Sequence, residues 1–149
     1  MSERLRVLHV IPSVARQHGG PSRAMALIER SLADSDIDCE VATTDDDGPG
    51  RRLAGRFGRD GLPADAAGAS TRRRFFAKRS EFYKVSPALA LWLWRHVRDY
   101  DVVHIHALFS FSSVAAAWIA RRAGVPYVIR PLGTLTEYGV SRRRPRLKR

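Results

Sequence analysis

The apolar segment Asp101–His106 (DVVHIH) ends with two histidines, His104 and His106, that are separated by a single residue. If this segment is a strand, both imidazoles point to the same face, because side chains alternate along a strand. Such a pair can bind zinc, although a metal site needs at least one more ligand and the sequence offers no clustered candidate. Ligands of parallel sheets bind beyond the carboxyl ends of the strands. We therefore predict a binding or catalytic role for His106, a hydrogen-bonded core position for His104, and no metal.

The loop Gly19-Gly20-Pro21 is the second candidate, because it lies between a predicted strand and a predicted helix. A helix N-terminus carries unpaired N–H groups and a partial positive charge, and glycines would let a phosphate approach them. A tight strand-to-helix turn could equally require the glycines for its backbone alone. The dinucleotide fingerprint G-x-G-x-x-G is absent, since Pro21 and Ala24 occupy its other glycine positions, and no P-loop motif occurs. The aspartates Asp45–Asp47 are expected to form a solvated turn rather than a ribose site.

The elements that must position these residues alternate between strand and helix. Strands are expected at residues 5–11, 39–43, 102–106 and 125–130, and helices at residues 21–33, 87–98 and 112–123. This alternation implies a parallel sheet with right-handed crossovers. We predict an α/β fold, a Rossmann-like parallel sheet flanked by helices, in one domain that spans residues 1–149.

Residues 45–81 are expected to form a long basic loop region within this domain, because six glycines and two prolines lie between Gly48 and Arg79 without a sustained period. Within it, the segment Arg72–Arg79 (RRRFFAKR) joins five bases to two phenylalanines. This segment could contact an anionic membrane surface, with Phe75 and Phe76 in the interface. Nucleic-acid binding by phosphate neutralisation is a weaker alternative. A solvated loop whose aromatic residues cap the core is as consistent with the pattern.

The composition is that of an ordinary globular domain apart from its charge. Of the 149 residues 44% are apolar, which excludes wholesale disorder, while the net charge is +11. Much of this excess lies in Arg72–Arg79 and in Ser141–Arg149. Cys39 is the single cysteine, so no intrachain disulfide can form. Neither a signal peptide nor a stretch of about 18 apolar residues occurs, so we expect a cytoplasmic location, with peripheral contact at the cytoplasmic membrane through Arg72–Arg79.

Five segments together resemble the amino-terminal domain of family 4 glycosyltransferases. They are Leu5–Ser13 (LRVLHVIPS), Gly19-Gly20-Pro21, Asp101–His106 (DVVHIH), Ala123–Pro126 (AGVP) and Arg130–Leu135 (RPLGTL). The resemblance implies the N-terminal half of a GT-B fold, in which two Rossmann-like domains face each other across a cleft. It also implies transfer of a sugar from a nucleotide diphosphate donor to a glycan or lipid-linked acceptor, with retention and without a metal. The nucleotide sugar is then a substrate, and no cofactor is implied.

The resemblance assigns site residues by position. The Gly19 and Gly20 loop would face the cleft near the donor phosphate and the acceptor, and His106 would lie near the sugar. Arg130, Gly133 and Thr134 would border the same cleft. The family's second domain, with most nucleotide-sugar contacts and two glutamates eight positions apart, has no counterpart in this sequence. We therefore expect a fragment, a truncated reading frame or one half of a split enzyme, which is inactive without its C-terminal domain.

Two interpretations from other classes stay open. One is a non-catalytic Rossmann-like binding module whose basic tail contacts nucleic acid or membrane, which a salt-dependent affinity for DNA would support. The other is a metal hydrolase built on the His104 and His106 pair, which stoichiometric zinc would support. The short length of the chain argues against the hydrolase.

Overall fold

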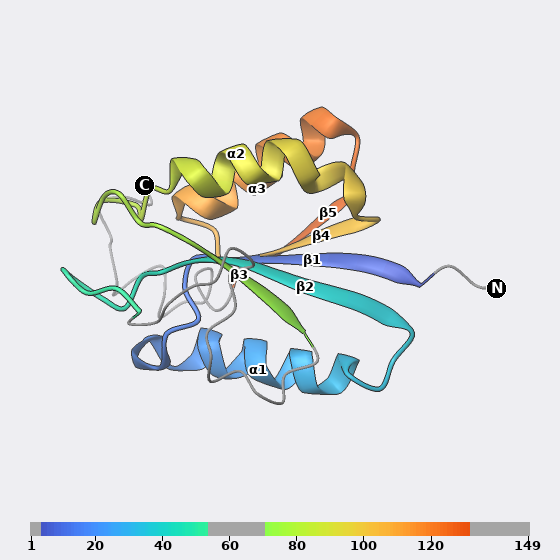
Figure 1. Cartoon of the computed structure of the whole chain (residues 1–149), viewed down its shortest axis with the longest axis horizontal. Coiled ribbons are helices and arrows are strands. Elements are labelled where there is room, and N and C mark those ends of the chain that lie inside the picture. Colours follow the sequence, from blue (N-terminus) through green and yellow to red (C-terminus); the bar gives the residue numbers. More distant parts are fainter. Residues whose placement is uncertain (1–3, 54–70, 132–149) are drawn as a thin grey trace.

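The computed structural model describes residues 4–53 and 71–131, which form one parallel sheet with helices on both faces (Figure 1). The strand order is β3-β2-β1-β4-β5, and every neighbouring pair is parallel. The strands are β1 (Leu5–Ile11), β2 (Ile37–Thr44), β3 (Arg72–Phe76), β4 (Val102–His106) and β5 (Tyr127–Arg130). This architecture confirms the predicted α/β, Rossmann-like fold.

The helices divide between the two faces of the sheet. Helix α1 (Gly20–Leu32) lies against one face, and α2 (Pro87–His96) and α3 (Phe111–Ala123) lie against the other (Figure 1). Two short 3-10 helices precede α1 and follow α2, at Arg16–His18 and Val97–Asp99. Among the described residues, no helix is long and apolar enough to cross a bilayer.

Local sequence explains where α2 and α3 begin and where α3 ends. The Ser86 hydroxyl accepts a hydrogen bond from the Leu89 backbone N–H at 3.4 Å, and the Ser110 hydroxyl accepts one from the Ser113 N–H at 3.2 Å. Gly124 follows α3 with a φ of 76°, which glycine adopts without strain. The structure confirms the three predicted helices and four predicted strands, with ends displaced by no more than about two residues. They could be predicted because such signals are local.

The core is split by the sheet, and this division decides where the histidines lie. Toward α2 and α3, the larger cluster buries Leu8, Val10, Leu89, Leu93, Val103 and Ile105 among others. Toward α1, a smaller cluster holds Ile11, Met25 and Val41. Because side chains alternate along β1, His9 shares the α1 face with Ile11. His104 pairs in register with His9, so His104 and His106 lie on this face too.

Residues Arg72–Phe76 form the edge strand β3, so the prediction of a continuous loop over residues 45–81 is wrong there. Phe76 packs against the core, with its ring centroid 5.5 Å from that of Trp92. This apolar contact anchors the segment to the sheet despite its three consecutive arginines. Residues 54–70 of the expected loop lie outside the described residues.

Acids within the domain also bind the basic side chains of this segment. Arg73 forms an ion pair with Glu29 of α1, and Arg74 forms one with Glu40 of β2. Lys78, just beyond β3, has only 4% of its side chain exposed. Three of the five bases of Arg72–Arg79 are therefore held by carboxylates or buried, which leaves Arg72 and Arg79 exposed, and the membrane contact through this segment stays a prediction.

Candidate functional site at the carboxyl edge of the sheet

The strand order reverses between β1 and β4, and ligands of doubly wound sheets bind in the crevice beyond this point. The loop after β1 leads to Gly19 and Gly20 at the start of α1, and β4 ends at His106. The loops that follow β2 and β3 lie at the same edge of the sheet (Figure 1). The structure thus brings Gly19, Gly20 and His106 to the edge where this kind of fold binds ligands.

The two glycines at the start of α1 differ in what the backbone requires. Gly19 has a φ of 66° and a ψ of −112°, a conformation that residues with a Cβ atom disfavour. The turn itself therefore explains why a glycine stands here. Its N–H donates to the carbonyl oxygen of Arg16 at 3.1 Å and is not free for a phosphate. Gly20 has no positive φ, and a Cβ added there would meet nothing within 4 Å. Neither strain nor crowding explains Gly20, which stands where helix N–H groups lack intrahelical partners.

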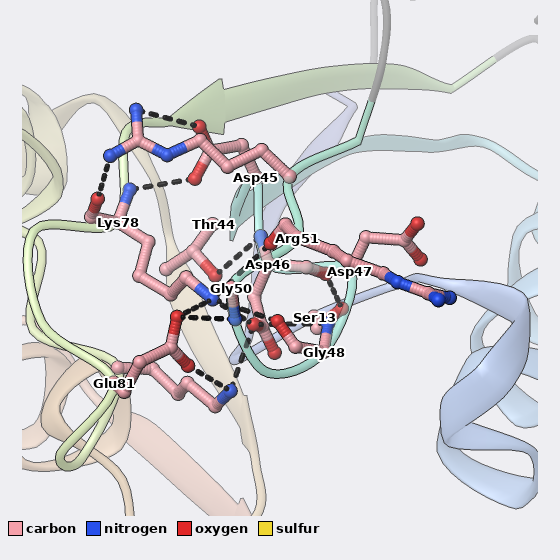
Figure 2. Close-up of polar contacts among 12 residues, drawn as sticks. Ser13, Thr44, Asp45, Asp46, Asp47, Gly48, Gly50, Arg51, Lys78 and Glu81 are labelled. Atoms are coloured by element: carbon pink, nitrogen blue, oxygen red, sulfur yellow. Dashed lines mark hydrogen bonds and ion pairs between the residues drawn. The ribbon is translucent and has the colours of Figure 1, made fainter.

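A buried ion-pair network joins the loops after β1, β2 and β3 (Figure 2). Its centre is Asp46, whose Oδ1 accepts hydrogen bonds from Lys78 Nζ at 2.7 Å and Lys84 Nζ at 2.8 Å. Oδ2 of Asp46 lies 3.0 Å from Nε2 of His18, which precedes α1. In Figure 2, Lys78 and Glu81 reach from the loop after β3 toward Asp46. Asp46 exposes only 2% of its side chain, so the prediction of a solvated acidic turn is wrong at this residue.

Burial and ion pairing act in opposite directions on this network. Burial alone would raise the pKa of the Asp46 carboxyl, but hydrogen bonds and charges from Lys78 and Lys84 lower that pKa to about 2. Burial would lower the pKa of Lys78, whereas hydrogen bonds to Asp46 and Glu81 raise it. Asp46 and Lys78 therefore stay charged at neutral pH. Fixed opposite charges thus hold the three loops together at neutral pH.

A solvent-open pocket of about 230 Å³ lies beside this network. It is lined by Gly50, Arg51, Arg52, Lys78, Arg79, Ser80 and Glu81. Four of these residues are basic and one is acidic, so the lining favours an anionic group. Glu81 is partly neutralised, because it pairs with Lys78 at 2.7 Å and accepts a hydrogen bond from the Gly50 N–H at 3.0 Å.

Three histidines converge on the α1 face of β1 and β4. The ring centroids of His104 and His106 are 4.2 Å apart. The ring centroid of His9 lies 5.0 Å from that of His104 and 5.2 Å from that of His106. Nδ1 of His9 and Nε2 of His106 form a hydrogen bond of 2.9 Å. Nε2 of His9 is buried, and no hydrogen-bond partner for it occurs among the described residues.

The burial of these histidines corrects the sequence-based expectation. His9 and His106 expose 2% and 1% of their surface, whereas His104 is only half-buried. The hydrogen-bonded core pair is therefore His9 with His106, and the prediction of this role for His104 is wrong. Burial, together with the neighbouring His104, lowers the pKa of His9 to about 4 and that of His106 to about 3. Both rings are thus neutral at neutral pH.

The backbone is strained directly after His106. Ala107 has a φ of 94°, which non-glycine residues rarely adopt, and such residues concentrate at functional sites. Its N–H donates to the carbonyl oxygen of Arg130 at 3.0 Å, and Arg130 pairs in register with His106. The predicted site residue Arg130 therefore lies beside His106. Gly133 and Thr134 lie outside the described residues.

Sequence reasoning found neither His9 nor the ion pair of Asp46 with Lys78, which we call the clamp. A possible signal for His9 was a histidine inside an otherwise apolar strand, in register with the H-x-H segment. The clamp has no motif, because its partners are 32 residues apart on different loops.

One family model matches the chain over residues 19–149, and its description is a glycosyl transferase 4-like domain. The match includes Gly19, Gly20, the clamp and the H-x-H strand. No curated protein and no solved structure matches the chain significantly.

Proposed function

This chain belongs to the glycosyl transferase 4-like family, and from that membership we propose that it is the acceptor-side domain of a sugar-transferring enzyme. The donor is a nucleotide diphosphate sugar, and the acceptor is a glycan or a lipid-linked saccharide. A second, C-terminal domain completes the site across a cleft. The observation that carries the proposal is that Gly20, at the start of the helix after β1, and His106, at the end of β4, lie where the strand order reverses, within the matched region.

The proposed reaction retains the configuration of the sugar and needs no metal. The C1–O bond to the diphosphate breaks, a C1–O bond to the acceptor hydroxyl forms, and the hydroxyl proton passes to the leaving diphosphate. The protein contributes orientation and charge stabilisation, which together can supply most of a rate enhancement. Free N–H groups at the start of α1 suit this task, because they attract phosphate oxygens. Gly20, whose Cβ position is open, allows that approach.

His106 is proposed to hold the sugar or the acceptor by a hydrogen bond. Its place at the end of β4 and the strained backbone of Ala107 support this role. Because burial keeps the imidazole neutral, it suits a hydrogen-bonding role better than a proton-transferring one. Arg130, beside it in the sheet, adds a positive charge close to the proposed cleft.

The basic pocket beside the clamp is the proposed place for a charged part of the acceptor. Arg51 and Arg79 are exposed at its rim, and the clamp fixes the loops that carry them. A phosphate of a lipid-linked acceptor, or an acidic sugar, would match this lining. Replacing Arg51 and Arg79 with serine should raise the KM for an anionic acceptor and leave the KM for the donor unchanged.

The two-domain proposal is tested by assaying the 149-residue chain with a panel of nucleotide sugars, alone and together with its second domain. We expect background turnover for the chain alone, because a GT-B site is assembled between two domains. Turnover well above background without the second domain would contradict this. A steeply salt-dependent affinity for DNA, with no transfer in either assay, would instead favour a non-catalytic nucleic-acid-binding module.

The residue roles are tested in the complete enzyme. His106→Ala should lower kcat by about tenfold or more, since loss of one preorganised hydrogen-bonding group typically costs about 10²–10³. His104→Ala is the matched control, because it removes an imidazole from the same face of the same strand. Addition of EDTA should not lower the rate. If His104→Ala lowered kcat as much as His106→Ala, the role would not belong to His106.

A further inference from the structure

We propose that His9, His104 and His106 form a zinc-binding site between β1 and β4. One ring nitrogen from each of the three lies within 4.8 Å of the other two. Zinc binds histidine nitrogens at about 2.0–2.1 Å, which in a tetrahedral site places them roughly 3.3–3.4 Å apart. The nitrogens therefore need to approach one another by about 1.5 Å at most, which rotation of three side chains can provide. The sequence predicted no metal because His9, the third ligand, is supplied by a different strand.

An unsatisfied nitrogen supports this site independently of the distances. Nε2 of His9 is buried without a hydrogen-bond partner among the described residues, although buried polar atoms are almost always satisfied. A neutral histidine that shares one hydrogen bond with His106 keeps either a proton or a lone pair unused on its other nitrogen. A zinc ion bound through Nε2 of His9 would satisfy this atom and remove the cost of leaving it unpaired.

The donor set selects the class of metal. Three imidazoles without a carboxylate suit zinc and neighbouring transition metals, whereas magnesium and calcium prefer oxygen ligands. Three protein ligands leave a fourth position for water or another small ligand. Arg130 lies opposite His106 in the sheet and repels a cation, so we expect an anionic fourth ligand, such as hydroxide, to offset that charge. His104 is half-buried and provides the route by which the ion enters.

This site shares His106 with the proposed transfer site, so zinc and the substrate would compete for this residue. Zinc would take the lone pair of His106, so a bound ion would oppose the hydrogen-bonding role proposed for this residue. Its effect on the fold would be to tie β1 to β4 where the strand order reverses. The inference does not depend on the transferase function, because it is tested by metal binding to this chain.

The test is calorimetric titration of the chain, without a histidine tag, with Zn²⁺ after treatment with EDTA. We expect one ion per chain and a rise in the unfolding temperature with zinc. His104→Gln and His9→Asn should each weaken the affinity by about 100-fold or more, since loss of even a second-shell partner costs about 10–100-fold. The matched control is His96→Gln, because His96 is a surface histidine that contacts Asp99 and lies outside the cluster. This variant should bind zinc as the unchanged chain does.

Three outcomes would overturn the proposal. They are no stoichiometric binding to the unchanged chain, full affinity in His104→Gln, or an equal loss in His96→Gln. His9 is buried, so His9→Asn is interpreted only if its circular dichroism matches that of the unchanged chain. His104→Gln alters a half-buried residue and carries the test by itself if His9→Asn does not fold.

Discussion

Oδ1 of Asp46 and Nζ of Lys78 lie 2.7 Å apart in a buried site, although 32 residues separate them in the sequence. Asp46 follows β2 and Lys78 follows β3, so their ion pair closes the edge of the sheet between two neighbouring strands. Lys84 and His18 contact the same carboxylate from two further positions. Asp46 therefore links the loop after β3, which lines the basic pocket, to the short helix before α1.

We expect Asp46→Asn to lower the free energy of unfolding by about 3 kcal/mol. The substitution keeps the shape of the side chain but leaves the buried Lys78 with only the half-exposed Glu81 as an ion-pair partner, and breaking a buried pair costs about 3–5 kcal/mol. Urea denaturation measures the change. Asp47→Asn, in a half-buried neighbour that accepts a hydrogen bond from Gln17, should cost less than about 1 kcal/mol. Equal losses in the two variants would contradict the central role of Asp46.

The same carboxylate should make stability depend on pH in acid. The pKa of Asp46 is about 2 in the folded chain, below its usual value of 3.8, so the unfolded chain binds the proton first as pH falls. Its contribution is complete above about pH 4 and is lost as pH falls toward 2, by about 2 kcal/mol in total. The difference in unfolding free energy between the unchanged chain and Asp46→Asn should therefore shrink across this range. A constant difference would show that the pKa of Asp46 is not depressed.

The buried histidines should act over a different pH range. The pKa values of His9 and His106 are lowered to about 4 and about 3 by burial, against 6.5 for an ordinary histidine. The unfolded chain therefore binds protons that the folded chain does not, and stability in metal-free buffer should fall as pH drops from about 6.5 toward 4. Each histidine contributes up to about 1.4 kcal/mol per pH unit. His106→Asn should reduce this slope, whereas His96→Gln, at the exposed end of α2, should leave it unchanged.

The two glycines at the start of α1 should separate structural from ligand-binding requirements. Gly19→Ala places a side chain on a backbone with a φ of 66° and should cost about 1–3 kcal/mol of unfolding free energy. Gly20→Ala meets open space on an unstrained backbone, so stability should stay within about 0.5 kcal/mol. Thermal or urea unfolding of both variants measures this contrast. In the complete enzyme, Gly20→Ala should still lower turnover, and unchanged turnover would remove Gly20 from the proposed site.

Two arginines of β3, Arg72 and Arg74, should contribute differently to the free energy of unfolding, although the sequence does not distinguish them. Arg74 pairs with Glu40 and lies over the ring of Trp92, with 5.2 Å between the guanidinium carbon and the ring centroid. Arg72 is exposed. We expect Arg74→Ser to lower the unfolding free energy by about 1–3 kcal/mol and Arg72→Ser by less than about 0.5 kcal/mol. Equal losses in the two variants would indicate that Arg74, like Arg72, is a solvated side chain, as the composition of the segment predicts.

Much of the fold could be predicted from the sequence because its signals are local. The apolar runs of β1 and β4, the serine caps of α2 and α3 and the glycine after α3 each act within a few residues, and together they imply a parallel sheet. The positions of Gly20 and His106 at the carboxyl edge follow from the same alternation of strands and helices.

Only the tertiary structure decided which of the charged and polar residues are buried. The segment Arg72–Arg79 reads as a basic loop until Glu29 and Glu40 are brought against it from α1 and β2. His9 joins the H-x-H pair only because β1 and β4 are neighbours, although His9 and His106 are 97 positions apart in the sequence. Charge compensation and side-chain convergence depend on contacts between elements far apart in the chain, and local composition carries no information about those contacts.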